Sequence, residues 1–259
     1  MGAVAVKGLR TAASFLTRVP FDRGTAERPD LAGSLPWFPV IGGLLGLGLA
    51  GAYAGILQVL PAFPAAAITL GISLLLTGAL HEDGLADTAD ALGGGRTREE
   101  VLSILKDPAH GTYGVLAIVM SLALRISALA TLDGWTALAV LPGAHALSRG
   151  AVVGLLGIVS PATDEGLGAS FVSALTPRET AAALGTALLI GAASLGGWVT
   201  VAAPVAATCS FGVGLVAVRR IGGITGDLLG AAQQASEIFV ILIGAAVAAS
   251  GWSSVAWWR

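Results

Sequence analysis

Three aspartates stand at helical spacing in the most highly charged stretch of this sequence. Asp83, Asp87 and Asp90 occupy positions i, i+4 and i+7, so a helix places their carboxylates on one face. Like charges at this spacing repel one another, and a divalent cation with oxygen ligands relieves the repulsion. Magnesium suits such a site because it shares its coordination between one or two carboxylates, waters and substrate phosphates. The spacing predicts metal-dependent phosphotransfer, with a solvated acidic helix face as the alternative.

The residues that flank the three aspartates have functional or structural explanations. His81 is interpreted equally well as a functional group and as a hydrogen-bonding structural residue. Glu82 faces away from Asp83 on a continuous helix, so we expect it to be solvated. A run of three glycines then ends the helix. Thr97 and Glu100 have the spacing of a capping box, which predicts a second, short helix.

Further charged residues lie in or beside apolar stretches. An unpaired guanidinium inside a membrane is costly, so Arg149 is expected to pair with phosphate or carboxylate. Arg125 lies nearer the other end of its stretch and is expected to extend towards Asp133. Asp227 follows a glycine-rich run, 222–226, whose glycines permit close backbone approach to a ligand.

The chain that carries these residues has the composition of a membrane protein. Its 259 residues are 55% hydrophobic and 12% charged, whereas an ordinary soluble domain carries about 25% charged residues. Mean hydropathy is +0.83. The net charge of -2 provides no basic field, which excludes sequence-independent nucleic-acid binding. The single cysteine excludes a disulfide framework and a two-cysteine metal motif.

Apolar stretches of roughly 20 residues predict membrane-spanning helices. The sequence therefore predicts an all-α, polytopic transmembrane bundle that forms one integral membrane domain, 1–259. Glycines at small-xxx-small spacing, such as Gly42 and Gly46, are expected to let its helices approach closely. About seven spans are predicted: Pro36–Leu60, Pro64–Leu80, Gly111–Leu132, Trp135–Val159, Thr180–Trp198, Val199–Val218 and Ile238–Trp257.

The distribution of basic residues orients the predicted bundle. If the N-terminus is cytoplasmic, eleven of the fourteen basic residues fall in cytoplasmic segments, as the positive-inside rule requires. The sequence thus predicts a multi-pass protein of the cell (inner) membrane. Residues 1–35 are expected to form an interfacial segment with an amphipathic helix at its start. Residues 81–110 are expected to form an acidic active-site segment in the cytoplasm.

The acidic run 77–90, TGALHEDGLADTAD, resembles the hallmark of the cobalamin synthase family, the adenosylcobinamide-GDP ribazoletransferases. The resemblance spans nearly the whole chain, because further motifs occur in the family's order at 15–20, 106–107, 111–116, 147–149, 165–168 and 222–227. The sequence departs from the family at Ala91, where glycine is common. It departs again at 108–110, Pro-Ala-His, where the family has a serine, a basic residue and an isoleucine.

The resemblance implies a transferase that joins adenosylcobinamide-GDP to alpha-ribazole or its 5'-phosphate, releases GMP and requires Mg2+. The implied metal ligands are Asp83, Asp87, Asp90 and one or both of Asp107 and Asp227. The implied catalytic residues, which take a proton or stabilise phosphate charge, are His81, Asp90, Lys106 and Arg149. The implied substrate-binding residues are His110, Thr112, Arg219, Arg220, Gly223 and Gly226. Arg219 and Arg220 are interpreted equally well as topology anchors.

Two other functions are weighed against this one. A phosphotransferase that uses CDP-alcohols also carries spaced aspartates, but its motif has an Ala-Arg pair and a longer spacing that this chain lacks. An ion-coupled transporter is expected to hold its acids near mid-membrane in paired half-helices. Here seven of the sixteen acids lie between Glu82 and Asp107. The partners implied are the two substrates and the lipid bilayer, with association with other cobalamin-assembly enzymes or with itself left open.

Overall fold

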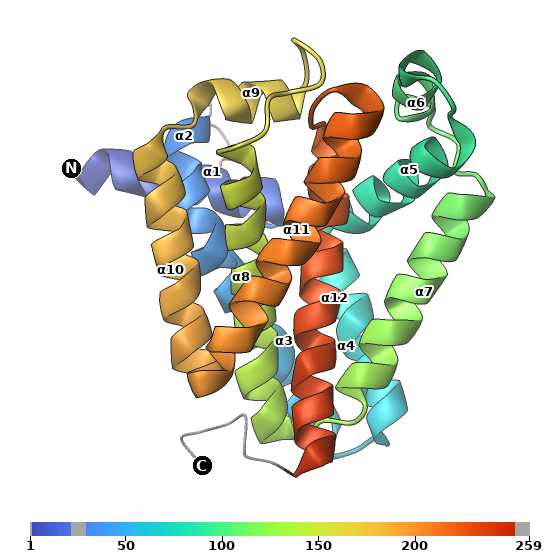
Figure 1. Cartoon of the computed structure of the whole chain (residues 1–259). Helices are drawn as coiled ribbons and strands as arrows, with labels where there is room; N and C mark the ends of the chain where they lie inside the picture. Colours follow the sequence, from blue (N-terminus) through green and yellow to red (C-terminus); the bar gives the residue numbers. More distant parts are fainter. Residues whose placement is uncertain (1, 22–29, 252–259) are drawn as a thin grey trace.

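The computed structural model describes residues 2–21 and 30–251, and within these residues every regular element is a helix. This confirms the predicted all-α class. Figure 1 shows long helices running side by side, with shorter helices gathered at one end of the bundle. The elements are α1 (Gly2–Leu16), α2 (Leu31–Ser34), η1 (Leu35–Trp37), α3 (Phe38–Ile56), α4 (Ala62–Thr77), α5 (Leu80–Gly94), α6 (Arg98–Ile104), α7 (Thr112–Leu129), α8 (Gly134–Leu156), α9 (Leu167–Ala174), α10 (Pro177–Leu195), η2 (Gly196–Trp198), α11 (Val199–Ile221) and α12 (Gly226–Ser250).

The long helices are apolar enough to cross a membrane. Five stretches meet the length and hydropathy of a span, and α4 with α5 makes a sixth if that bent pair is counted. One of the five, Pro177–Ile221, contains both α10 and α11. The chain reverses between these two helices (Figure 1), at Gly196, which has φ +57°. The predicted multi-pass bundle of about seven spans is therefore confirmed.

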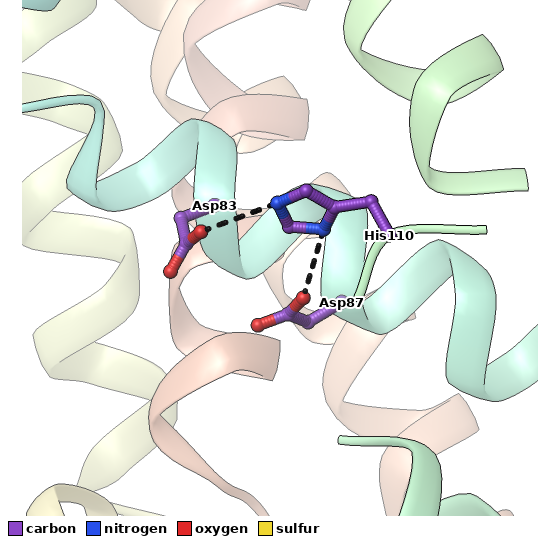
Figure 2. Close-up of side chains that lie close together, drawn as sticks. All are labelled: Asp83, Asp87 and His110. Carbon is purple, nitrogen blue, oxygen red and sulfur yellow. Dashed lines mark ion pairs between the residues drawn. The ribbon is translucent and has the colours of Figure 1, made fainter. Parts of the chain in front are cut away.

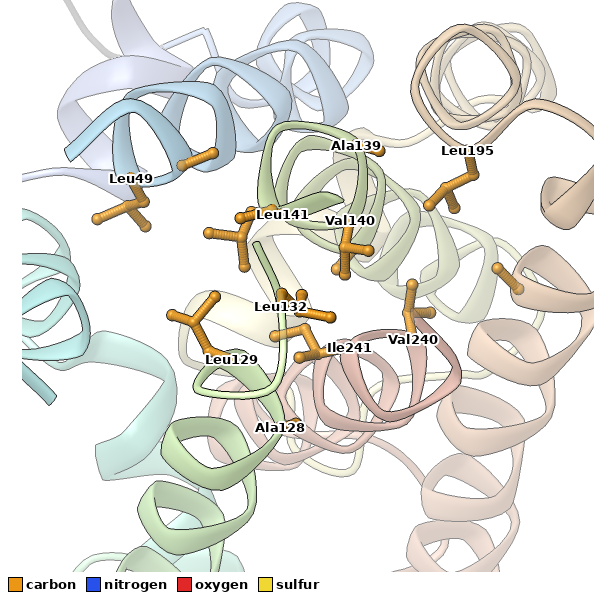
Figure 3. Packing of buried hydrophobic residues seen from close by; sticks show 14 of the residues in the cluster. Leu49, Ala128, Leu129, Leu132, Ala139, Val140, Leu141, Leu195, Val240 and Ile241 are labelled. Atoms are coloured by element: carbon orange, nitrogen blue, oxygen red, sulfur yellow. The ribbon is translucent and has the colours of Figure 1, made fainter. Parts of the chain in front are cut away.

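Helix α8 is the centre of the bundle. It packs against α3, α10, α11 and α12, and most of its residues are buried. Gly42 and Gly46 allow the contact with α3, because a Cβ atom there would lie 2.5 Å from the His145 carbonyl oxygen and 2.4 Å from that of Leu141. Figure 3 shows Val140 and Leu141 of α8 among core side chains of α3, α7 and α12. The predicted close packing at these two glycines is confirmed.

A sharp break separates α4 from the helix that carries the aspartates. The axes of α4 and α5 differ by 91°. Gly78 and Ala79 both adopt left-handed backbone conformations, with φ +65° and +55°. The second predicted span therefore ends at Thr77, and α5 does not continue its path through the bundle. Figure 1 shows α5 and α6 at the same end as α1, α2 and α9.

The last span also begins earlier than predicted. Helix α12 starts at Gly226, whereas the hydropathy of the sequence placed the start at Ile238. Polar residues at 227, 233, 234 and 237 lower the hydropathy of the first half of this helix. Most of them are buried against neighbouring helices, so they belong to the bundle interior. Residues 252–257 of the predicted span lie outside the described residues, as do Arg23 and Arg28.

The break between α4 and α5 gives a test of the fold. We expect Gly78→Ala to destabilise the protein by about 1–2 kcal/mol, because an L-residue is strained at positive φ and the added Cβ would meet the Arg18 side chain. The matched control is Gly71→Ala in α4, where a Cβ meets nothing within 4 Å. Thermal unfolding of both variants in detergent measures the difference. Equal unfolding midpoints would show that the left-handed break is not required.

Candidate active site

Helix α5 brings two of the predicted ligands together with a histidine from a distant loop. The oxygen Oδ1 of Asp83 lies 3.8 Å from Nε2 of His110, and Oδ1 of Asp87 lies 3.4 Å from Nδ1 of the same ring. Figure 2 shows the imidazole between the two carboxylates. One donor atom from each residue lies within 4.8 Å of the others, a spacing that a single ion can bridge. Two of the three predicted carboxylates therefore lie together, with His110 beside them.

The electrostatics of this group favour a bound cation. Burial, together with the charges of Asp83 and Asp227, raises the pKa of Asp87 to about 6, although His110 opposes the shift. A carboxyl group with this pKa is partly protonated near neutral pH unless positive charge is supplied. The arrangement can therefore hold a divalent ion through carboxylate oxygens.

Asp90 has a different environment from the other two aspartates. Its Oδ2 accepts a hydrogen bond of 2.6 Å from the Gly111 N–H, and its Oδ1 accepts one of 2.9 Å from the Gly114 N–H. Gly111 is the N-cap of α7, where a carboxylate also interacts favourably with the helix dipole. The side chain of Asp90 thus ties α5 to α7 and lies outside the group formed by Asp83, Asp87 and His110.

Asp227 approaches the group from the first turn of α12. Gly84 and Gly230 bring the two helices together, because a Cβ on Gly84 would lie 2.8 Å from the Asp227 carbonyl oxygen and one on Gly230 would lie 3.3 Å from the Gly84 Cα. Asp227 is near enough to Asp87 to raise its pKa. The structure thus brings Asp227, rather than Asp107, to the aspartates of α5.

Two cavities meet at Asp227. The first lies between α1, α3, α5, α8, α9 and α12, and its polar wall is made by His81, Asp83, Arg149, Asp227 and Gln233. Its other wall is apolar. The second cavity lies between α6, α9 and the start of α12, and it is lined in part by Lys106, Thr163, Glu165, Gly226 and Asp227. The predicted catalytic residues His81, Lys106 and Arg149 therefore all face space that a substrate can enter.

His81 is neutral in this setting. It is buried, and burial together with the charge of Arg149 lowers the pKa of its ring to about 3. The ring is therefore uncharged at neutral pH. It can donate or accept a hydrogen bond in the cavity, but it is a weak base.

A buried network of charged and amide side chains lies behind the site. The Arg149 guanidinium pairs with the Glu237 carboxylate, which also lies 3.1 Å from Nδ1 of His145 and 3.5 Å from Nη1 of Arg125. Nη1 of Arg125 lies 2.9 Å from Oε1 of Glu82. Two carboxylates thus face two guanidinium groups, and their formal charges cancel.

The network corrects two expectations. Glu82 is 6% exposed and Arg125 is 2% exposed, so Glu82 is not solvated and Arg125 does not extend towards Asp133. They pair with each other because the break at Gly78–Ala79 turns α5 across the bundle, where Glu82 points inward. Arg149 meets a carboxylate, which was one of its two expected partners.

Several members of the network were not predicted. Gln233 donates hydrogen bonds to Glu237 at 2.6 Å and to Ser148 at 3.2 Å. Gln234 donates to Glu82 at 3.2 Å. The sequence contained one signal for Glu237: two arginines inside apolar stretches need counter-charges, and this glutamate directly precedes the last predicted span.

The remaining predicted residues lie around the rim or hold loops. Asp107 is exposed and accepts a hydrogen bond of 3.0 Å from the Ala109 N–H. Thr112 is exposed at the start of α7, and Arg219 is exposed at the end of α11. Arg220 donates to the Gly95 carbonyl oxygen. A Cβ on Gly223 would lie 2.5 Å from the Ser160 carbonyl oxygen, so this glycine allows two loops to approach each other.

Loop contacts also fix the short helix α6. Thr97 and Glu100 form the predicted capping box, which is thereby confirmed. Arg98, which was not predicted to have a role, donates to the carbonyl oxygens of Ile221 at 2.9 Å and Ala162 at 2.8 Å. These bonds attach α6 to the segment that precedes Asp227.

Comparison with known proteins gives a consistent result. The sequence model of the family described as Cobalamin-5-phosphate synthase matches residues 8–245. An adenosylcobinamide-GDP ribazoletransferase of Bradyrhizobium diazoefficiens is 40% identical over 93% of this chain and 94% of its own length. Proteins of the same name from Rhizobium etli and Escherichia coli are 41% and 36% identical, each over 88% of this chain and 92% and 95% of their own lengths. No solved structure matches the chain.

The buried network predicts a large effect of a small substitution. We expect Glu237→Gln to destabilise the protein by about 3–5 kcal/mol, because it leaves Arg149 and Arg125 buried with one carboxylate between them. Glu179→Gln is the matched control. It removes a carboxylate from the partly exposed capping box of α10, where the expected cost is below about 1 kcal/mol. Unfolding midpoints in detergent compare the two, and equal losses would contradict the importance of the network.

Proposed function

The chain belongs to the Cobalamin-5-phosphate synthase family, and from this we propose that it joins adenosylcobinamide-GDP to alpha-ribazole or its 5'-phosphate. The products are GMP and adenosylcobalamin or its phosphate. The observation that carries the proposal is the meeting of two cavities at Asp227, beside the carboxylates of Asp83 and Asp87. Two large substrates can thus reach one acidic centre from different sides.

The reaction is a phosphoryl transfer. A hydroxyl oxygen of ribazole bonds to the phosphorus that carries the cobinamide arm, and the bond from that phosphorus to the oxygen bridging to the guanosine phosphate breaks. GMP leaves with the bond's electron pair, and the hydroxyl proton passes to a base. Positioning and neutralisation of charge dominate such reactions, so the protein needs few covalent steps.

The residues of the site divide these tasks. Lys106 lines the second cavity and is our candidate for binding the departing guanosine phosphate, while Arg149 lines the first cavity and stabilises charge there. Neutral His81 orients the hydroxyl by hydrogen bonding. Because burial makes His81 a weak base, an aspartate that does not bind the ion is the better candidate to take the hydroxyl proton.

Asp83 and Asp87 are the residues that would hold Mg2+, with Asp227 completing the set from α12. Their oxygen donors suit a hard divalent cation, and the raised pKa of Asp87 indicates a site that lacks positive charge. When bound, the ion would neutralise charge on the pyrophosphate. Imidazole nitrogen is not a preferred magnesium ligand, so we assign His110 to substrate contact. Asp90 holds the start of α7 through two backbone N–H groups and serves to position α5.

We further propose that the protein lies in the cell (inner) membrane with this end of the bundle in the cytoplasm. The segments that carry Lys7, Arg98, Lys106 and Arg178 lie at the same end as α5 (Figure 1), which supports a positive cytoplasmic face. Nucleotide-activated substrates occur on that side. Reporter fusions after Arg96 and after Leu60 test the orientation, and an external signal at Arg96 would contradict it.

The central test is turnover by purified protein. With adenosylcobinamide-GDP, alpha-ribazole and Mg2+, we expect GMP to be released, and we expect chelation by EDTA to stop the release until Mg2+ is restored. Asp83→Asn is expected to lower turnover by about 100-fold or more, because it removes one charge from the cation site. Asp133→Asn, at the N-cap of α8, is the matched control and should retain activity, since asparagine is also a good N-cap.

The raised pKa of Asp87 predicts a pH dependence of cation binding. Below pH about 6 the carboxyl group is protonated in the free protein, so a proton must leave before a cation can bind. We therefore expect the affinity for Mg2+, measured by calorimetry in detergent, to fall as the pH is lowered from 7 to 5. Asp87→Asn should bind more weakly at pH 7 but lose less affinity over this range. A wild-type affinity that is constant from pH 7 to 5 would contradict the role of Asp87.

A further inference from the structure

The cavity beside Asp83 has an aromatic wall that the chemistry proposed above does not use. Phe15 of α1, Phe38 of α3 and Phe171 of α9 line it. Their ring centroids are 5.6, 5.2 and 5.8 Å apart, with one stacked pair and two edge-to-face pairs. Three segments that are distant in the sequence thus meet at one place. They form part of the lining of a cavity that also carries charged residues.

The polar lining of the same cavity includes a buried donor that lacks an acceptor. The Arg149 residue is 2% exposed, and its Nε has no hydrogen-bond partner among the described residues. The other side of its guanidinium is engaged by Glu237, Ser148 and His145. A buried N–H without a partner is unfavourable. An acceptor oxygen on a molecule in the cavity would satisfy it.

We propose that this cavity binds ribazole, an inference that rests on the function proposed above. The base of ribazole packs against Phe15, Phe38 and Phe171, and the ribose lies towards Arg149 and the acidic end. There Asp83 and Asp227 line the same cavity, so the attacking hydroxyl reaches the site where the carboxylates gather. The cavity and its open mouth together contain about 720 Å³ of empty space, of which only part is enclosed by protein.

The aromatic wall offers no hydrogen-bond partners, so it favours the part of the two substrates that needs fewest of them. The dimethylbenzimidazole of ribazole is bicyclic, carries two methyl groups and has no hydrogen-bond donor, so it loses little when apolar side chains surround it. Guanine has an amide edge and an amino group that need partners, and the aromatic wall provides none. The corrin ring with its amide side chains is far larger and is excluded by size. Guanine and the corrin ring therefore lie outside the aromatic cavity. The guanosine phosphate lies in the cavity that Lys106 lines.

The proposal is tested by measuring the two substrates separately in one variant. We expect Phe171→Leu to raise the KM for alpha-ribazole and its calorimetric Kd by about tenfold, through loss of an aromatic contact. The KM for adenosylcobinamide-GDP should change by less than about twofold. Alpha-ribazole 5'-phosphate should show the same shift, because it carries the same base. Leu156→Phe, which narrows the cavity, should act in the same direction without removing an aromatic ring.

Phe239→Leu is the matched control, because Phe239 is 51% exposed on α12 and does not line the cavity. It should leave both KM values unchanged. The proposal is wrong if Phe171→Leu and Leu156→Phe are folded and keep the wild-type KM and Kd for alpha-ribazole, or if the KM values of both substrates rise together. Absence of GMP release by the wild-type protein would instead contradict the proposed function. Calorimetric binding of alpha-ribazole would still decide the role of the cavity in that case.

Discussion

The carboxylate of Glu237 is the point on which the interior of this bundle depends. It lies among Arg149, Arg125 and His145, and through Arg125 it is linked to Glu82. These residues come from α5, α7, α8 and α12. Buried charges are stable only when every one of them is matched. The network therefore favours the arrangement of the four helices that pairs these charges, and that arrangement sets the position of the site.

Helix α5 connects the buried network to the candidate active site. Its buried face carries a carboxylate that is paired, and its exposed face carries the carboxylates of the site. Glu82 faces inward and is neutralised by Arg125. Asp83, the next residue, has a side chain that is 64% exposed and lies with Asp87 at the open face. The inner pairing holds the helix while the outer carboxylates repel one another. Rigid support of this kind allows like charges to remain close together.

Local patterns predicted much of this molecule, and long-range pairing explains what they missed. The spacing of the aspartates, the capping box at Thr97 and the apolar stretches each depend on nearby residues, and each is found in the structure. The pairing of Glu82 with Arg125 depends on the direction of α5, which is set by a break at Gly78–Ala79. A left-handed Ala79 has no sequence signal, because alanine favours a regular helix. The start of α12 was missed since hydropathy treats paired and unpaired polar residues alike.

The break between α4 and α5 at Gly78–Ala79 also affects how a large charged substrate can approach a membrane enzyme. Helix α4 has 16 residues, or about 24 Å of rise, which is less than the roughly 30 Å of a typical hydrocarbon core. The chain then turns by 91°, so α5 lies across the bundle end instead of continuing along it. The polar side chains of α5 are thereby held at the end of the bundle on a helix rather than on an unstructured loop. Under the function proposed above, the pyrophosphate of one substrate can then stay hydrated while the aromatic base of the other leaves water for the apolar cavity.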